Sequence, residues 1–202
     1  MAHRRPAPAF AAGCLLAAAL CCVGAAPSSS AAAGIDDLMA ALSRVRESRS
    51  TFREEKELAG LTRPLVSRGT LLYVAPDHLE KRTSEPIREE IVVDGDRLTY
   101  ARPAENLRRT IGLDRAPELR GLVEAVRGTF AGDLEALRRH YSVGFEGEAG
   151  DDWRLTLVPL DERVRGFFRA VRIDGRETRL RRVETIEPNG DVSRMTIEPD
   201  PR

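Results

Sequence analysis

The sequence predicts an α+β fold, in which one large, strongly curved antiparallel sheet forms an open, incomplete β-barrel with a few helices against it. Three two-residue turn signals, Asp94-Gly95, Asp174-Gly175 and Asn189-Gly190, join segments in which apolar and polar residues alternate. This pattern is typical of antiparallel hairpins. Apolar residues at helical spacing occur only before these segments and in the middle of the chain. The spacing of the turn signals and of the alternating segments predicts roughly nine or ten strands in a single domain.

Two helical regions are expected, an N-terminal helix and a mid-chain helical pair. Residues 35–47 place their apolar side chains on one face. In residues 117–139, Pro117 and Gly132 bound a first helix and Asp133 caps a shorter second one. We expect these helices to act as a lid over the sheet. The candidate lid residues are Leu38, Leu42, Leu122 and Val126.

The strands are expected in two groups, on either side of the mid-chain helices. Pro103 is expected to end the first group, because proline cannot donate a backbone hydrogen bond to a neighbouring strand. The expected strands are 65–75, 78–84, 88–94 and 97–100, then 141–145, 153–157, 169–174, 178–187 and 192–198.

Alternation along these strands places a set of large apolar side chains on the inner face of the sheet. They are Leu71, Tyr73, Ile91, Val93, Leu98, Tyr100, Trp153, Leu155 and Leu157. Two interpretations stay open, a packed core and a sheet curled around a cavity, because both favour Leu, Val and Ile. In a cavity each buried methylene contributes ~0.8 kcal/mol, so a chain of about 16 carbons would gain roughly 12 kcal/mol before costs.

The N-terminus has the pattern of a secretory signal peptide over residues 1–33. A short basic start precedes an uncharged apolar stretch, residues 7–26, and small residues follow it. Cleavage is expected near residue 26 or residue 33, and an uncleaved membrane anchor is the alternative. All three cysteines lie in this segment, so the mature domain, residues 34–202, is expected to be exported, periplasmic and free of cysteine.

Charge and motifs exclude several classes of function. The formal net charge is +0, and without Arg4 and Arg5 the balance is 30 basic to 32 acidic residues, which argues against a nucleic-acid partner. His78 and His140 stand far apart without metal-ligand spacing, and no nucleophile with its base is apparent. We therefore predict no catalytic residue, no metal, no cofactor and no enzymatic activity.

One basic run has two interpretations. Arg179-Leu180-Arg181-Arg182 fits a site that binds anionic groups, or an ordinary solvated sheet surface. Regular alternation on a strand would divide its arginines between the two faces, which favours the solvated surface.

An ordered set of short motifs runs from residue 35 to residue 198. It comprises Thr51-Phe52-Arg53-Glu54-Glu55-Lys56, Gly69-Thr70-Leu71 with Pro76, Val93-Asp94-Gly95 with Leu98 and Tyr100, and Trp153-Arg154-Leu155-Thr156-Leu157-Val158-Pro159. In this order the motifs resemble the LolA-type outer-membrane lipoprotein carriers.

The resemblance implies an open β-barrel of about eleven strands with a helical lid. It also implies a monomer whose apolar cavity accepts acyl chains of lipoproteins or related lipids, between an inner-membrane exporter and an outer-membrane acceptor. Two departures stand out: Ala75 replaces the basic residue that the family has before Pro76, and the chain stops soon after the last expected strand. They leave open another lipid as cargo, and a non-enzymatic sensor or assembly module that docks on an envelope lipid exporter.

Overall fold

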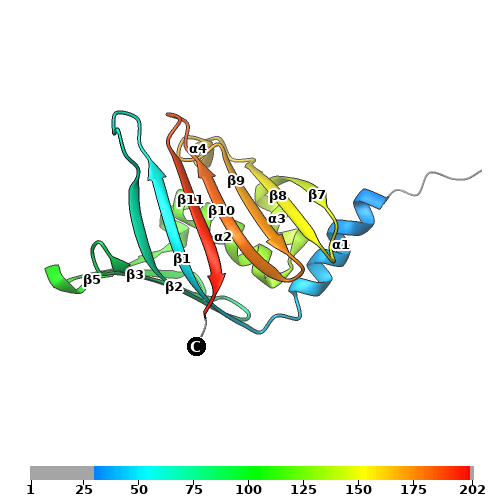
Figure 1. Cartoon of the computed structure of the whole chain (residues 1–202), viewed down its shortest axis with the longest axis horizontal. Helices are drawn as coiled ribbons and strands as arrows, with labels where there is room; N and C mark the ends of the chain where they lie inside the picture. The colour runs from blue at the N-terminus through cyan, green and yellow to red at the C-terminus, as the bar shows by residue number, and fades with distance from the viewer. Residues whose placement is uncertain (1–29, 201–202) are drawn as a thin grey trace, which may run out of the picture.

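One eleven-stranded antiparallel sheet forms the framework of the protein (Figure 1). The computed structural model describes residues 30–200, with side chains from residue 34. The strand order is β6-β5-β4-β3-β2-β1-β11-β10-β9-β8-β7. The strands are β1 (Glu47–Glu57), β2 (Leu65–Val74), β3 (His78–Glu85), β4 (Glu89–Asp94), β5 (Arg97–Arg102), β6 (Leu107–Gly112), β7 (Tyr141–Gly147), β8 (Asp152–Pro159), β9 (Ala170–Arg176), β10 (Arg179–Ile186) and β11 (Val192–Pro199).

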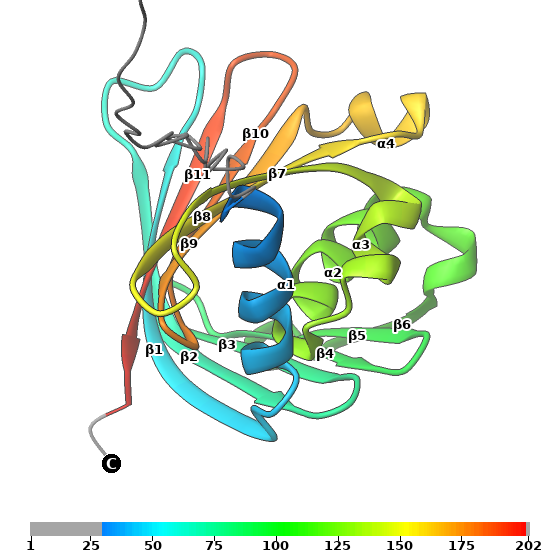
Figure 2. The ribbon, with the colours of Figure 1, turned by 90° about the vertical axis from the view of Figure 1, so that its right-hand side faces the viewer.

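The sheet curls into an incomplete barrel with helices on its concave side (Figure 2). Its edge strands, β6 and β7, do not pair with each other, so the barrel is open as predicted. The helices of the described residues are α1 (Ser30–Leu42), α2 (Pro117–Ala131), α3 (Leu134–His140) and α4 (Glu162–Arg165), with 3-10 helices at Pro103–Glu105 and Leu113–Arg115. The expected N-terminal helix and mid-chain pair are therefore confirmed, although α1 ends at Leu42 rather than at residue 47.

The ends of the mid-chain helices follow the sequence signals. Pro117 occupies the first turn of α2, where its missing N–H is not needed, and Gly132 ends the helix with a left-handed φ of 64°. The Asp133 carboxylate then accepts a hydrogen bond of 2.8 Å from the Ala136 backbone N–H and caps α3. Two helices can therefore follow each other with a sharp reversal between them.

Most of the packed core lies under one half of the sheet. Leu155, Leu157 and Ile173, from β8 and β9, have no exposed surface and belong to one apolar cluster with α1 and α3. A second, smaller cluster joins Val123 of α2 to Val93 of β4 and neighbouring side chains. Between these two clusters the concave face is less densely filled.

The prediction that Asp174-Gly175 forms a hairpin turn was wrong. Strand β9 continues to Arg176, and the turn follows at Glu177, whose φ is 52°. Gly175 serves a different purpose, because a Cβ there would lie 2.1 Å from Cζ2 of Trp153. The indole ring of Trp153 lies across this glycine and donates a hydrogen bond of 2.8 Å to the Glu177 carbonyl.

The prediction that Pro103 ends the first group of strands was also wrong. Pro103 starts a 3-10 turn, and Asn106, with φ at 51°, reverses the chain into β6. Strand β6 then pairs with β5, with Leu107 opposite Arg102 at one end and Gly112 opposite Arg97 at the other. The other two turn signals lie where the chain reverses between paired strands. Asp94 is the last residue of β4 and the turn residues are Gly95 and Asp96, whereas Asn189-Gly190 lies between β10 and β11.

The predicted signal peptide, residues 1–33, lies outside the described residues apart from its last four, which begin α1. Between residues 30 and 200, no helix combines the length and the apolar character needed to cross a bilayer.

Replacing Gly175 by alanine is expected to destabilise the protein by about 2 kcal/mol, because the added methyl group must displace the Trp153 ring. Urea unfolding followed by Trp153 fluorescence measures the loss. Gly150→Ala is the matched control, since nothing lies within 4 Å of its added Cβ, and it is expected to change stability by less than about 0.5 kcal/mol. Equal stability of the two variants would contradict the packing argument.

Candidate ligand-binding cavity

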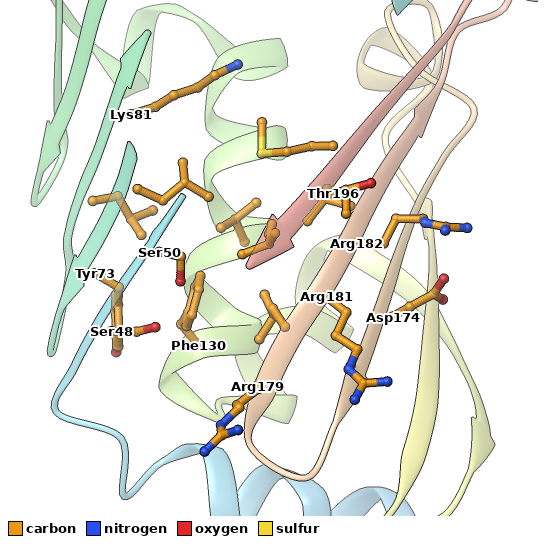
Figure 3. Close-up of a pocket in the computed structure, with 18 of the residues that line it drawn as sticks. Ser48, Ser50, Tyr73, Lys81, Phe130, Asp174, Arg179, Arg181, Arg182 and Thr196 are labelled. Carbon is orange, nitrogen blue, oxygen red and sulfur yellow. The ribbon is translucent and has the colours of Figure 1, made fainter. Parts of the chain in front are cut away.

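A cavity of about 1270 Å³ lies between α2 and the central strands of the sheet (Figure 3). Strands β1 to β5 form one wall, and β10 and β11 form another. Most of its large side chains are apolar. They include Leu71, Tyr73, Leu79, Ile91, Val93 and Leu98 from the first strands, Leu119, Leu122, Val123, Val126 and Phe130 from α2, and Trp153, Leu180, Val183, Met195 and Ile197 from the later strands.

Short side chains on β1 explain why this part of the concave face is open. Ser48 and Ser50 point to the same side as the cavity residues Tyr73 and Leu71, with which they pair. A serine fills little of the space between the sheet and a helix packed over it. On the helix side, the Phe130 ring stacks on the Tyr73 ring with 4.7 Å between the ring centroids. Helix α2 therefore packs against β2 at the edge of the open space.

The structure brings eight of the predicted residues to the cavity. Its wall includes six of the nine sheet candidates and two of the four lid candidates. These are Leu71, Tyr73, Ile91, Val93, Leu98, Trp153, Leu122 and Val126.

Five other predicted residues lie elsewhere. Leu155 and Leu157 are fully buried and pack with Leu38 and Leu42 of α1 in the main core cluster, away from the cavity wall. Tyr100 donates a hydrogen bond of 3.1 Å from its hydroxyl to Glu89 at the end of β4. Strand alternation therefore identified the inner face but did not show where a helix covers it.

Sequence reasoning missed the contribution of the last two strands and of three helix positions. Val183, Met195 and Ile197 follow the same alternation as the predicted residues and were available to the same argument. On α2, Leu119, Val123 and Phe130 also line the cavity. The polar residues Glu54 and Lys81 carried no signal, because only the pairing of β1 with β2 and β2 with β3 brings them together.

An ion pair lies on the inner wall of the cavity. Lys81 Nζ is 2.5 Å from Glu54 Oε2, and both side chains are about three-quarters buried. Ser193 donates a hydrogen bond of 2.7 Å to the same carboxylate, and Ser67 donates one of 3.3 Å. The ammonium also lies 5.0 Å from the centre of the Phe52 ring, within the range of a cation–π contact.

These contacts fix the charge of Glu54. Burial favours the neutral carboxyl and would raise its pKa, but the Lys81 charge and the hydrogen bonds from Lys81, Ser193 and Ser67 outweigh it. The net result is a pKa below the ordinary value, so Glu54 is ionised at neutral pH. The Lys81 cation on this wall of the cavity is therefore paired.

Helix α2 is fastened to the turn between β4 and β5. Arg120 Nη2 donates a hydrogen bond of 3.1 Å to Asp96 Oδ1, and Arg127 Nη1 donates one of 2.8 Å to the Gly95 carbonyl. The Asp94-Gly95 turn thus anchors the helix that covers the cavity. Within residues 34–200, no group of three or more His, Cys, Asp or Glu side chains is placed to hold a metal ion.

An open antiparallel barrel with an apolar cavity under a fastened helix defines the structural class of this protein. Its family is also shown: the chain belongs to the LolA-like family of outer membrane lipoprotein carrier proteins, whose model matches residues 25–199. The resemblance seen in the ordered motifs is thereby confirmed. A comparison with curated protein sequences finds no significant match.

Solved structures that are similar to this chain have low sequence identity and low TM-scores. A LolA superfamily protein from Nitrosomonas europaea is 13% identical, with a TM-score of 0.41 over 82% of this chain and 91% of that one. The MucA/MucB complex of Pseudomonas aeruginosa contains a chain that is 15% identical, with a TM-score of 0.42 over 81% of this chain and 55% of that one. At such identities no partner or activity transfers to this chain.

Replacing Lys81 by methionine is expected to destabilise the protein by about 2 kcal/mol at pH 7, because it leaves the Glu54 carboxylate buried without its cation. The stability that comes from a lowered carboxyl pKa is present above about pH 4.5 and is lost as the pH falls through the folded-state pKa. The difference from wild type should therefore shrink as the pH falls below about 4.5. Urea unfolding at several pH values measures it.

The matched control is Lys56→Met, since Lys56 is the only other lysine of the chain. It pairs with Glu187 at 3.0 Å, but at 42% exposure of its side chain the pair is expected to contribute less than about 1 kcal/mol. A pH-independent loss in the Lys81 variant would contradict the ion-pair argument.

Proposed function

We propose that this protein is a periplasmic carrier, which binds acyl chains of lipoproteins or related envelope lipids in its cavity and takes them toward the outer membrane. The observation that carries the proposal is the apolar cavity of about 1270 Å³ under helix α2, in a member of the LolA-like family. The activity is one of binding and transfer, without a chemical step.

The size and the lining of the cavity support acyl chains as the ligand. Typical pockets for drug-sized molecules occupy about 300–1,000 Å³, so this cavity is large for a compact polar metabolite. Each methylene that leaves water contributes ~0.8 kcal/mol, so a long chain gains enough to offset the cost of leaving a membrane or a solvent-exposed state.

The fastening of α2 supports a cavity that opens and closes. The hydrogen bonds from Arg120 and Arg127 end on the turn of one hairpin. Asp96 is largely exposed, so its contact with Arg120 contributes little to stability. To open the cavity toward β4 and β5, helix α2 would loosen these contacts while its other side stays packed in the main core, where Ala125 is fully buried and the Tyr141 hydroxyl donates a hydrogen bond to the Gly121 carbonyl.

The predicted signal peptide supports a location outside the cytoplasm, where such a carrier would work. In this proposal an inner-membrane exporter loads the protein and an outer-membrane acceptor receives the lipid, and the carrier acts as a monomer. The signal sequence also gives a direct check, since a mature periplasmic chain that begins near residue 27 or 34 would agree with it.

Trp153 allows a binding test on the unmodified protein. It is the single tryptophan of the chain and lines the cavity, so an acyl chain carrying bromine atoms is expected to quench its fluorescence on binding. Val126→Glu, on the cavity side of α2, should weaken binding at least about tenfold, because a carboxylate then has to be buried against the chain.

Val158→Glu is the matched control for this experiment. Val158 lies on β8 outside the cavity wall and is 39% exposed, so the same substitution there should leave binding unchanged. A protein that purifies without lipid and shows no quenching by brominated chains would contradict the carrier proposal. That result would favour the alternative, a sensor or assembly module that uses the same fold as a docking surface.

A further inference from the structure

The sheet contains a window where three strands diverge. Strand β10 pairs with β11 only between the pair Arg182 and Thr196 and the pair Ile186 and Val192. The first residues of β10 therefore pair with β9 alone, and the last residues of β11 pair with β1 alone. The register of β1 with β11 extends only to Ser50–Pro199. One further backbone hydrogen bond of 3.4 Å runs from the Asp200 N–H to the Arg49 carbonyl, and residues 47–49 of β1 otherwise pair with β2. Figure 1 shows β10 and β11 separating toward the end of β11.

The cavity extends through this window to the convex face. Its wall includes Ser48, which lies on the inner face of the sheet beside the buried Tyr73. It also includes Thr196 and Glu198, which are exposed on the other face of β11. In Figure 3, Ser48 and Ser50 on β1 lie on one side of the opening, and Arg179 and Arg181 on β10 lie on the other.

A β-bulge in β10 places three exposed arginines beside the window. The pairing of β10 with β9 shifts by one residue between Leu180 and Arg182. Regular alternation would turn consecutive side chains to opposite faces, but a bulge breaks that alternation. As a result Arg179, Arg181 and Arg182 are all exposed and all border the cavity, while Leu180 is buried.

Two of these arginines are available to a ligand. Arg181 is bound to Asp152, with Nη1 and Oδ1 3.2 Å apart. In the part of the chain from residue 34 to residue 200, no carboxylate lies within ion-pair distance of Arg179 or Arg182.

The carboxylates around the window are distributed unevenly. Asp174 is bound to Arg154 at 2.7 Å, and Glu47 is bound to Arg49 at 2.6 Å. Glu198 lies on the opposite side of the window from β10, and Glu146, which also lines the cavity, lies on β7 opposite Arg154 of β8. An anion in the window is therefore attracted to the β10 side, where the unpaired guanidinium groups lie.

We propose that the window holds the anionic head group of an amphiphile whose acyl chain occupies the cavity, with Arg179 and Arg182 contacting a phosphate. This inference rests on the proposed carrier function and adds the class of ligand to it. A phosphate held at an exposed rim avoids the cost of burying a charge, while the chain reaches apolar surface at Leu180 directly inside. Guanidinium groups suit phosphate because they donate two parallel hydrogen bonds.

The test compares two lysophospholipids that carry the same brominated acyl chain, one with an anionic glycerol-phosphate head and one with a zwitterionic choline-phosphate head. Quenching of Trp153 measures both affinities. At low salt the wild-type protein is expected to bind the anionic lipid about tenfold more tightly, and this preference should fall as salt screens the charges. Inorganic phosphate at matched ionic strength should not displace the lipid, because it has no chain.

The double variant Arg179→Gln/Arg182→Gln should bring the anionic lipid to the affinity of the zwitterionic one and leave the latter unchanged. Arg108→Gln/Arg109→Gln changes two exposed arginines of the edge strand β6, outside the cavity wall. It removes the same charge and should preserve the preference. Equal wild-type affinities for the two lipids, or an equal loss in both double variants, would overturn the head-group site but not the carrier function. Absence of quenching by either lipid would overturn the carrier function itself.

Discussion

The pairing of β1 with β11 is the constraint on which the rest of the structure depends. Each half of the chain forms its own meander, and only the register that sets Phe52 opposite Ile197 joins them into one curved sheet. That register also aligns the inner faces of the two halves, so α2 covers a surface drawn from both. Because the pairing stops at Ser50 and Pro199, the same contact that closes the centre of the sheet leaves the window beside it.

Local signals in the sequence predicted the class of fold well, and they failed where a residue served a distant partner. Asp94-Gly95 is a turn because the chain reverses there and its glycine has a φ of 55°. Asp174-Gly175 has the same two residue types, yet its glycine lies in β9 and leaves space for the ring of Trp153, which belongs to β8. Pro103 marks a break in pairing but not the end of the meander, since a short 3-10 turn is enough to start β6. Such outcomes depend on contacts between distant segments, which a two-residue pattern does not contain.

The candidate site shows a similar division. Leu71 and Leu155 have the same place in their strands' alternation, and the pattern correctly assigns both to the inner face. Only the position of the helices separates them, since α1 covers Leu155 while Leu71 borders the cavity. The ion pair of Glu54 and Lys81 depends on three strands in register, and the exposed arginines of β10 depend on a bulge, so neither could be derived from residue order.

The uneven distribution of the core has a consequence for how this family member can change. Most of the side chains with no exposed surface lie on β8, β9, α1 and α3, whereas the cavity wall also contains many half-buried residues on β2, β4 and α2. Substitutions in that wall remove fewer packed contacts than substitutions in the core. The stability of the fold and the shape of the cavity thus depend largely on different parts of the molecule. New interior shapes can arise by mutation while the scaffold that supports them stays intact.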